Sequence, residues 1–88
     1  MITRVLMPRL GETMEEGILT KWLKQVGDPV SKREPIMEIE TDKVTVEVES
    51  FGAGILRKIL VDVGETVPIG ALLAIIADPA ENIDHVTE

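Results

Sequence analysis

One lysine of this 88-residue chain stands where it could do chemistry. Asp42-Lys43 separates two segments in which apolar and polar residues alternate, 37–40 and 44–49. If these segments form a hairpin whose loop is Asp42-Lys43, the amine of Lys43 is presented at its tip. An exposed amine can be acylated once an enzyme removes its proton, since its ordinary pKa is about 10.4. Tight two-residue loops favour Asn-Gly or Asp-Gly, so the turn itself does not select lysine, and such a departure is typical of a functional site.

The composition argues against most other chemistry. The chain has no Cys, which excludes a disulfide, a thiolate zinc site and a cysteine nucleophile. Its one His, His85, argues against a catalytic triad or a histidine metal cluster, so we predict no catalytic residue and no metal ligand. A formal net charge of −7 argues against a nucleic-acid partner. The longest apolar run, Ala71–Ala77, is far shorter than the roughly 18 residues of a membrane span, so no membrane partner is expected.

The residue types and their spacing predict an all-β fold. Val, Ile and Thr number ten, ten and seven, and β-branched side chains favour strands. Gly27-Asp28-Pro29, Gly52-Ala53-Gly54 and Gly64-Glu65 indicate turns, and no segment of ten or more residues carries a clear helical stripe. The expected strands cover residues 3–7, 17–24, 35–41, 44–49, 54–60 and 72–77, with shorter pieces around Val30 and Val67.

An internal repeat divides the chain into two similar halves. Gly17–Val30 matches Gly54–Val67 at an offset of 37 residues, with eight of fourteen pairs identical. The match extends from 36–39 to 73–76, allowing a one-residue slip, and backwards from Val5-Leu6-Met7 to Val44-Thr45-Val46. Two copies are too few for a solenoid. We therefore expect two sheets around one core, related by a pseudo-two-fold axis.

The repeat changes the interpretation of Asp42-Lys43. This dipeptide alone would be an ordinary solvated turn, but it lies at the junction of the two halves, and the repeat places about Pro79-Ala80 at the equivalent position. In a two-fold arrangement the junction and the chain ends lie at opposite poles. A tether leaving after Asp78 would then hold the domain with Asp42-Lys43 facing outward.

The alternation of residues also predicts the hairpin register. With Asp42 and Lys43 as the loop, Met37 faces Val48 and Ile39 faces Val46 on the inner side, while the polar pairs lie on the outer side. Those outer pairs are Glu38 with Glu47 and Glu40 with Thr45. Two like charges directly opposite each other cost stability. We therefore interpret the acidic outer face as kept for recognition.

These residues resemble a known family. Glu40-Thr41-Asp42-Lys43-Val44, between Gly27-Asp28-Pro29-Val30 and Gly54-Ile55-Leu56, resembles a lipoyl domain, the carrier domain of the dihydrolipoyl acyltransferases of 2-oxo acid dehydrogenase complexes. The opening 7–17, Met-Pro-Arg-Leu-Gly-Glu-Thr-Met-Glu-Glu-Gly, is similar to the start of that family, so the likeness runs from about Val5 to Asp78. The resemblance implies a flattened barrel of two four-stranded sheets, a barrel-sandwich hybrid, with the modified lysine at a hairpin tip.

The resemblance also implies a cofactor and partners. Lys43 would carry (R)-lipoate in amide linkage, attached by a lipoate ligase or lipoyl transferase. The lipoyl group would visit a thiamine-dependent 2-oxo acid decarboxylase, the acyltransferase core of its own chain and a dihydrolipoyl dehydrogenase, each at high effective concentration. The motif residues Glu40, Thr41, Asp42 and Val44 would be recognised by the modifying enzyme. The loop residues Leu10, Gly11, Glu12 and Thr13 would help the decarboxylase to recognise its own carrier.

Three other interpretations remain open at this point. The nearest is a biotin carboxyl carrier domain, which shares the fold but usually has Met on both sides of its lysine, where this chain has Asp42 and Val44. A glycine-cleavage carrier protein is normally longer and has its lysine in a different motif. The third is an unmodified barrel-sandwich module that serves only as a protein-interaction adaptor.

Several other residues are given structural roles. We expect Lys21, Lys24, Lys32 and Lys58 not to be carrier sites, Trp22 and Phe51 to pack in the core or at turns, and His85 to lie in a solvated tail. The tail has Pro early and little apolar content, so we expect a carrier domain over 1–79 and the start of an interdomain linker over 80–88. No transit peptide precedes Met1, so a bacterial or archaeal cytoplasm is expected over a mitochondrial matrix. Pyruvate, 2-oxoglutarate, branched-chain acids and acetoin stay open as the substrate.

Overall fold

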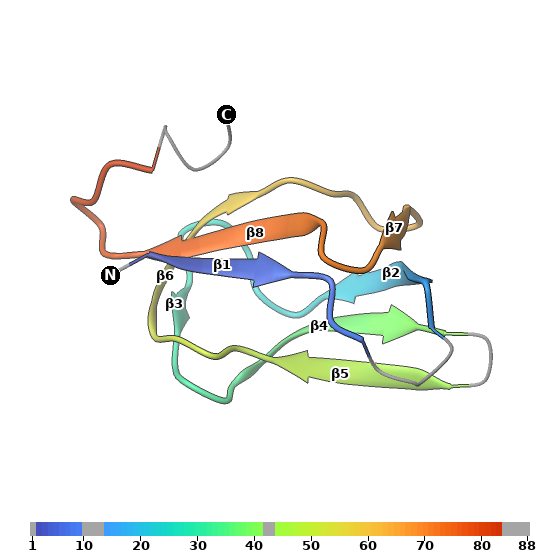
Figure 1. Ribbon diagram of the computed structural model, residues 1–88. Helices are drawn as coiled ribbons and strands as arrows, with labels where there is room; N and C mark the ends of the chain where they lie inside the picture. The colour runs from blue at the N-terminus through green and yellow to red at the C-terminus, as the bar shows by residue number, and fades with distance from the viewer. Residues whose placement is uncertain (1, 10–13, 42–43, 84–88) are drawn as a thin grey trace.

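The computed structural model describes residues 2–9, 14–41 and 44–83, and all regular structure in them is β-strand (Figure 1). The all-β prediction is confirmed, and every expected strand is present with bounds that differ by at most two residues. The strands are β1 Thr3–Leu6, β2 Glu16–Trp22, β3 Pro29–Val30, β4 Pro35–Glu40, β5 Thr45–Glu49, β6 Gly54–Ile59, β7 Thr66–Pro68 and β8 Leu72–Ala77.

The strands form two four-stranded antiparallel sheets that the repeat relates to each other. One sheet has the order β1-β8-β6-β3 and the other β5-β4-β2-β7. Exchanging the halves, so that β2 becomes β6, β3 becomes β7, β4 becomes β8 and β5 becomes β1, converts one order into the other. The predicted pair of sheets with pseudo-two-fold symmetry is therefore confirmed.

The symmetry extends to a β-bulge in each sheet. The register between β2 and β4 shifts between Leu19 and Lys21, and the register between β6 and β8 shifts between Leu56 and Lys58. These positions are 37 residues apart, so Thr20 and Arg57 are the equivalent extra residues of two bulges. A bulge increases the local twist of a strand. The slip allowed between 36–39 and 73–76 does not occur, since β4 and β8 keep the same offset.

The expected match of Val5-Leu6-Met7 with Val44-Thr45-Val46 is wrong. Val5 pairs with Ala74 and Val48 pairs with Met37, and Ala74 and Met37 are repeat equivalents, so the equivalent of Val5 is Val48. The connection between β1 and β2 is therefore longer than its counterpart by six residues rather than two. The mismatch escaped sequence comparison because alternating strands look alike at any even shift.

The core lies between the two sheets. Its buried side chains come from both halves and include Leu19, Ile36, Met37, Ile39, Leu56, Leu73 and Ile76, all fully inaccessible. Burying one such side chain contributes about 1.5–3 kcal/mol. Trp22 packs against this core as predicted, and its indole N–H donates to the carbonyl of Val61 at 3.1 Å. Of the two places expected for Phe51, the core is wrong, because the residue is 85% exposed, and the turn is right, because it lies in the bend after β5.

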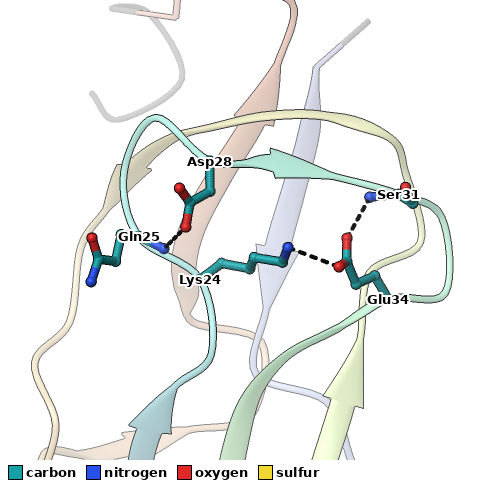
Figure 2. A network of polar contacts seen from close by, with 5 residues as sticks. All are labelled: Lys24, Gln25, Asp28, Ser31 and Glu34. Carbon is teal, nitrogen blue, oxygen red and sulfur yellow. Dashed lines mark hydrogen bonds and ion pairs between the residues drawn. The ribbon is translucent and has the colours of Figure 1, made fainter.

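Four turns of the described chain are closed in the same way. In each, the N–H of the fourth residue donates to the carbonyl of the first, and the carboxylate of the fourth residue accepts the N–H of the first. The four turns are Gln25–Asp28, Ser31–Glu34, Asp62–Glu65 and Asp78–Glu81. Figure 2 shows the side-chain contacts of the first two, together with the ion pair between Lys24 and Glu34. Acidic residues thus serve here as turn caps.

Candidate functional site

The hairpin of β4 and β5 has the predicted register. Glu40 pairs with Thr45, Ile39 with Val46, Glu38 with Glu47 and Met37 with Val48. Met37 and Ile39 are buried and their partners are half-buried, while Thr45 and Glu47 are exposed. The inward and outward faces therefore agree on both strands, as the alternation requires.

Hydrogen bonds between Thr41 and Val44 close the hairpin. The Thr41 N–H donates to the carbonyl of Val44 at 2.8 Å, and the Thr41 hydroxyl donates to the same carbonyl at 3.1 Å. Asp42 and Lys43, the predicted modification site, lie outside the described residues. The described neighbours Glu40, Val44 and Thr45 are exposed, Val44 to 56%. Thr41, on the other side of the candidate lysine, is half-buried, so the described residues beside it are exposed or partly exposed.

The closed end of the hairpin lies far from the described ends of the chain. In Figure 1, β4 ends and β5 begins at one end of the long axis, while β1 begins and β8 ends at the other. This arrangement of the four strands agrees with the predicted placement of the junction and the chain ends at opposite poles.

The outer face of the β4–β5 hairpin is acidic, and the equivalent positions in the other half of the domain carry no acidic residue. Glu38 is half-buried, and Glu40, Glu47 and Glu49 are exposed. The equivalent positions in the other half, by the repeat and by strand pairing, are Ile75, Ala77, Arg4 and Leu6. Because the same architecture forms with no acidic group at these four places, the fold does not require the acidic face.

The segment that contains the predicted recognition loop is anchored against the hairpin. Leu10, Gly11, Glu12 and Thr13 lie outside the described residues, but Met7 and Met14 on either side of them are buried. A Cβ added at Gly17 would lie 2.7 Å from Cγ2 of Ile39 and 3.0 Å from Cε of Met14. Glycine is therefore needed where this loop segment packs on strand β4.

Backbone bonds fasten the same segment to the connection between β7 and β8. Met7 donates to Ala71 and accepts from Gly70, both at 2.9 Å, and Ile69 donates to Glu15 at 3.1 Å. Sequence analysis missed Met7, Met14 and Gly17 as anchors. The signal that could have found Gly17 was its match with Gly54 in the repeat, which indicated a position with little room for a side chain.

A cleft of about 520 Å³ runs between the edge strands β1 and β5. Its apolar lining includes Leu6, Met7, Val48, Phe51 and Ile69, and Leu6 and Phe51 remain exposed at its margin. Its described lining does not include Thr41 or Val44, the described residues on either side of the candidate modification site.

An ion pair of the described chain lies away from the closed end of the hairpin. Lys24 forms an ion pair with Glu34 at 2.8 Å (Figure 2). Glu34 directly precedes the first residue of β4, and the hairpin tip follows the last residue of that strand. The hydrogen bond from Lys24, followed by that from the Ser31 N–H, lowers the pKa of the Glu34 carboxyl below its ordinary value. Three or more metal-ligating side chains do not converge anywhere in the described residues. The described residues contain no helix with the length and apolarity that crossing a membrane requires.

Comparison with known proteins gives a consistent family. The Biotin_lipoyl family, described as "Biotin-requiring enzyme", matches residues 3–76. The succinyltransferase component of the 2-oxoglutarate dehydrogenase complex of Staphylococcus saprophyticus is 47% identical over 89% of this chain and 18% of its own length. The acetyltransferase component of the pyruvate dehydrogenase complex of Rickettsia prowazekii is 48% identical over 90% of this chain and 20% of its own. This chain thus spans about a fifth of each of these relatives.

A solved structure gives the same assignment at the level of one domain. The lipoyl domain of the 2-oxoglutarate dehydrogenase complex of Azotobacter vinelandii superposes with a TM-score of 0.70 at 33% identity. The match covers 85% of this chain and 95% of that domain, so the two correspond over nearly their whole length.

Proposed function

Since the chain belongs to the Biotin_lipoyl family and is a lipoyl domain of the kind found in 2-oxo acid dehydrogenase acyltransferases, we propose that it acts as a swinging-arm carrier with lipoate attached to Lys43. The observation that supports this proposal is the register of the β4–β5 hairpin. Glu40 pairs with Thr45, and Thr41 is bonded to Val44, so the described pairing ends at the two residues that precede and follow Asp42-Lys43 in the sequence.

The described surroundings fit a covalently attached arm. Glu40, Val44 and Thr45 are exposed, and the cleft between β1 and β5 does not extend to them. These three residues are therefore accessible to a ligase that acts at this end of the hairpin. When bound, a lipoyl group supplies a dithiolane that takes up an acyl group with two electrons and gives them up at other active sites.

The residues of this chain contribute position and charge. The strand β4 ends and β5 begins at one end of the domain, and the described ends of the chain lie at the opposite end (Figure 1). Amide formation at Lys43 removes one positive charge beside an already acidic hairpin face. The chain thus presents its arm to visiting catalysts, and the chemical steps on the arm take place at their active sites.

The whole protein is proposed to be a dihydrolipoyl acyltransferase. The curated relatives include both a succinyltransferase and an acetyltransferase component, so we leave the acyl group unassigned. A thiamine-dependent decarboxylase, a dihydrolipoyl dehydrogenase and a lipoate ligase or lipoyl transferase are the proposed partners, in the cytoplasm of a bacterium or archaeon. Residues 1–79 are the proposed carrier domain and 80–88 the start of its linker.

Intact-mass measurement tests the attachment. The apo-domain is incubated with lipoate, ATP and lipoate ligase, and in parallel with biotin, ATP and biotin ligase. We expect one added lipoyl group on the wild type, none on Lys43→Ala, and one on the control variants Lys21→Ala and Lys58→Ala. An added biotinyl group alone would make the domain a biotin carrier, and no added group would leave an unmodified interaction module.

A second experiment tests the proposed recognition loop. Removing two residues from Leu10–Thr13 should leave lipoylation by the ligase unchanged and slow reductive acylation by the cognate decarboxylase. Because Met7 and Met14 hold the two ends of this segment, the shortened loop keeps its anchors. Equal rates of reductive acylation for the shortened and wild-type domains would refute the role.

A further inference from the structure

The β4–β5 hairpin, which contains the proposed modification site, is closed by hydrogen bonds that run in the opposite direction from those of the four carboxylate-capped turns. In those turns the capping side chain belongs to the fourth residue, as Asp28 and Glu34 illustrate (Figure 2). Between Thr41 and Val44 the capping side chain belongs to the first residue, Thr41. The N–H of Thr41 donates to the carbonyl of Val44, whereas in the other turns the N–H of the fourth residue donates to the carbonyl of the first. Val44 has no polar side-chain group with which to cap this turn.

The Thr41 hydroxyl replaces a main-chain partner. Residues that flank a two-residue hairpin loop ordinarily exchange two backbone hydrogen bonds. Here the Thr41 N–H bonds to the Val44 carbonyl at 2.8 Å, while the Val44 N–H meets the Thr41 hydroxyl oxygen at 3.4 Å. The same hydroxyl donates to the Val44 carbonyl at 3.1 Å. One side chain therefore contacts both backbone groups of the residue that follows Lys43.

This contact lies outside the core of the domain. Thr41 is half-buried and Val44 is 56% exposed, and neither residue belongs to the hydrophobic core cluster. Removing the hydroxyl would thus loosen the closure of the tip while the packing between the sheets stays the same. A local effect of this kind is distinguishable from a loss of global stability.

We propose that Thr41 is a positioning residue for the modification of Lys43, acting through Val44 rather than through contact with the ligase. The inference rests on the proposed function, since it concerns how the same lysine is presented. The hydroxyl holds the residue after Lys43 in register, which restricts the backbone from which the amine projects. Ordering the attachment point before the encounter lowers the entropy that the ligase complex must lose.

The test compares variants that keep or lose the hydroxyl. Thr41→Val preserves the shape and removes the hydroxyl, and Thr41→Ser keeps it. Thr45→Val is the matched control, because Thr45 is exposed one residue beyond Val44. Three quantities are measured on the apo-domain: kcat/KM for lipoylation, the exchange rate of the Val44 amide hydrogen, and Tm.

Each outcome decides the proposal. We expect Thr41→Val to lower kcat/KM about five- to tenfold, the factor for one net hydrogen bond, and to speed Val44 amide exchange with little change in Tm. Thr41→Ser and Thr45→Val should stay within about twofold of wild type. Wild-type values for Thr41→Val, or an equal loss in Thr41→Ser, would overturn the inference. Should Thr41→Val fail to fold, the smaller Thr41→Ala takes its place. A wild-type domain that accepts no lipoyl group would overturn the proposed function together with this inference.

Discussion

Leu19 and Leu56 are repeat equivalents, and each is held by a turn from the other half of the domain. Gly27 donates to the Leu56 carbonyl at 2.8 Å, and Leu56 donates to Asp28 at 3.0 Å. In the same way Gly64 donates to the Leu19 carbonyl at 2.7 Å, and Leu19 donates to Glu65 at 3.0 Å. Both leucine side chains are fully buried. Each half thus completes the backbone bonding of the other.

Truncating either leucine should destabilise the domain by a similar amount. Leu19→Ala and Leu56→Ala each remove a buried side chain and leave a cavity, which costs about 2–5 kcal/mol. Urea unfolding followed by circular dichroism measures the free energy of unfolding. Lys21→Ala and Lys58→Ala, the next exposed equivalents, are the controls and should change it by less than about 0.5 kcal/mol. A loss confined to one of the two leucines would contradict the reciprocal arrangement.

Replacing Arg33 by glycine should stabilise the domain. Arg33 has a φ of 71°, and its repeat equivalent is Gly70, with a φ of 90°. A left-handed backbone costs a non-glycine residue about 1–2 kcal/mol, so Arg33→Gly is expected to raise Tm by several degrees. Lys32→Gly, one residue earlier and without a positive φ, should instead lower Tm. Equal shifts in the two variants would show that the backbone angle is not the cause.

The stability of the Ser31–Glu34 turn should depend on pH through Glu34. The pKa of this carboxyl is lowered by the hydrogen bond from Lys24 and then by that from the Ser31 N–H. A depressed folded-state pKa stabilises the fold above the unfolded-state pKa and loses this contribution as the pH falls through the folded value. Wild-type Tm should therefore exceed that of Glu34→Gln at neutral pH, and the two should converge on acidification below about pH 4. Lys24→Gln should reduce the difference without abolishing it, since Ser31 remains. Parallel curves for wild type and Glu34→Gln would contradict the assignment.

Neutralising the acidic face of the hairpin should separate folding from recognition. Glu38 and Glu47 face each other across the pair of strands, so Glu38→Gln with Glu47→Gln should leave stability equal or raise it by up to about 1 kcal/mol. Because the equivalent positions in the other half carry no acid, we expect the loss to appear in reactions with partner proteins. Rates of lipoylation and of reductive acylation are compared with those of Glu16→Gln, an exposed acid on β2. Unchanged rates with every partner would remove the recognition role.

Residue alternation was sufficient to predict the hairpin. Side chains alternate with a period of two, so the pattern in 37–40 and 45–48 determines both the faces and the register, and β4 and β5 have the predicted pairs. The repeat likewise predicted two related sheets, because similar sequences make similar strands. The expected role of Lys43 also came from the sequence, by its motif. The strands, their faces and the motif around Lys43 depend on residues close together in the chain, so a local sequence pattern is enough to predict them.

Other features were decided only when the halves packed together. Sequence comparison did not find the equivalence of Val5 and Val48, because it depends on which strands pair. The hydrogen bonds from each half to Leu19 or Leu56, and the packing of Met7 and Met14 around Gly17, likewise connect residues far apart in the chain. The exposure of Phe51 was also decided by the packing of the two sheets. The bonds from the Thr41 hydroxyl also depended on the exact geometry of the turn. A one-dimensional pattern tells which face a side chain occupies, but not which atoms meet it across the core, because that depends on the volumes and backbone paths of both sheets at once.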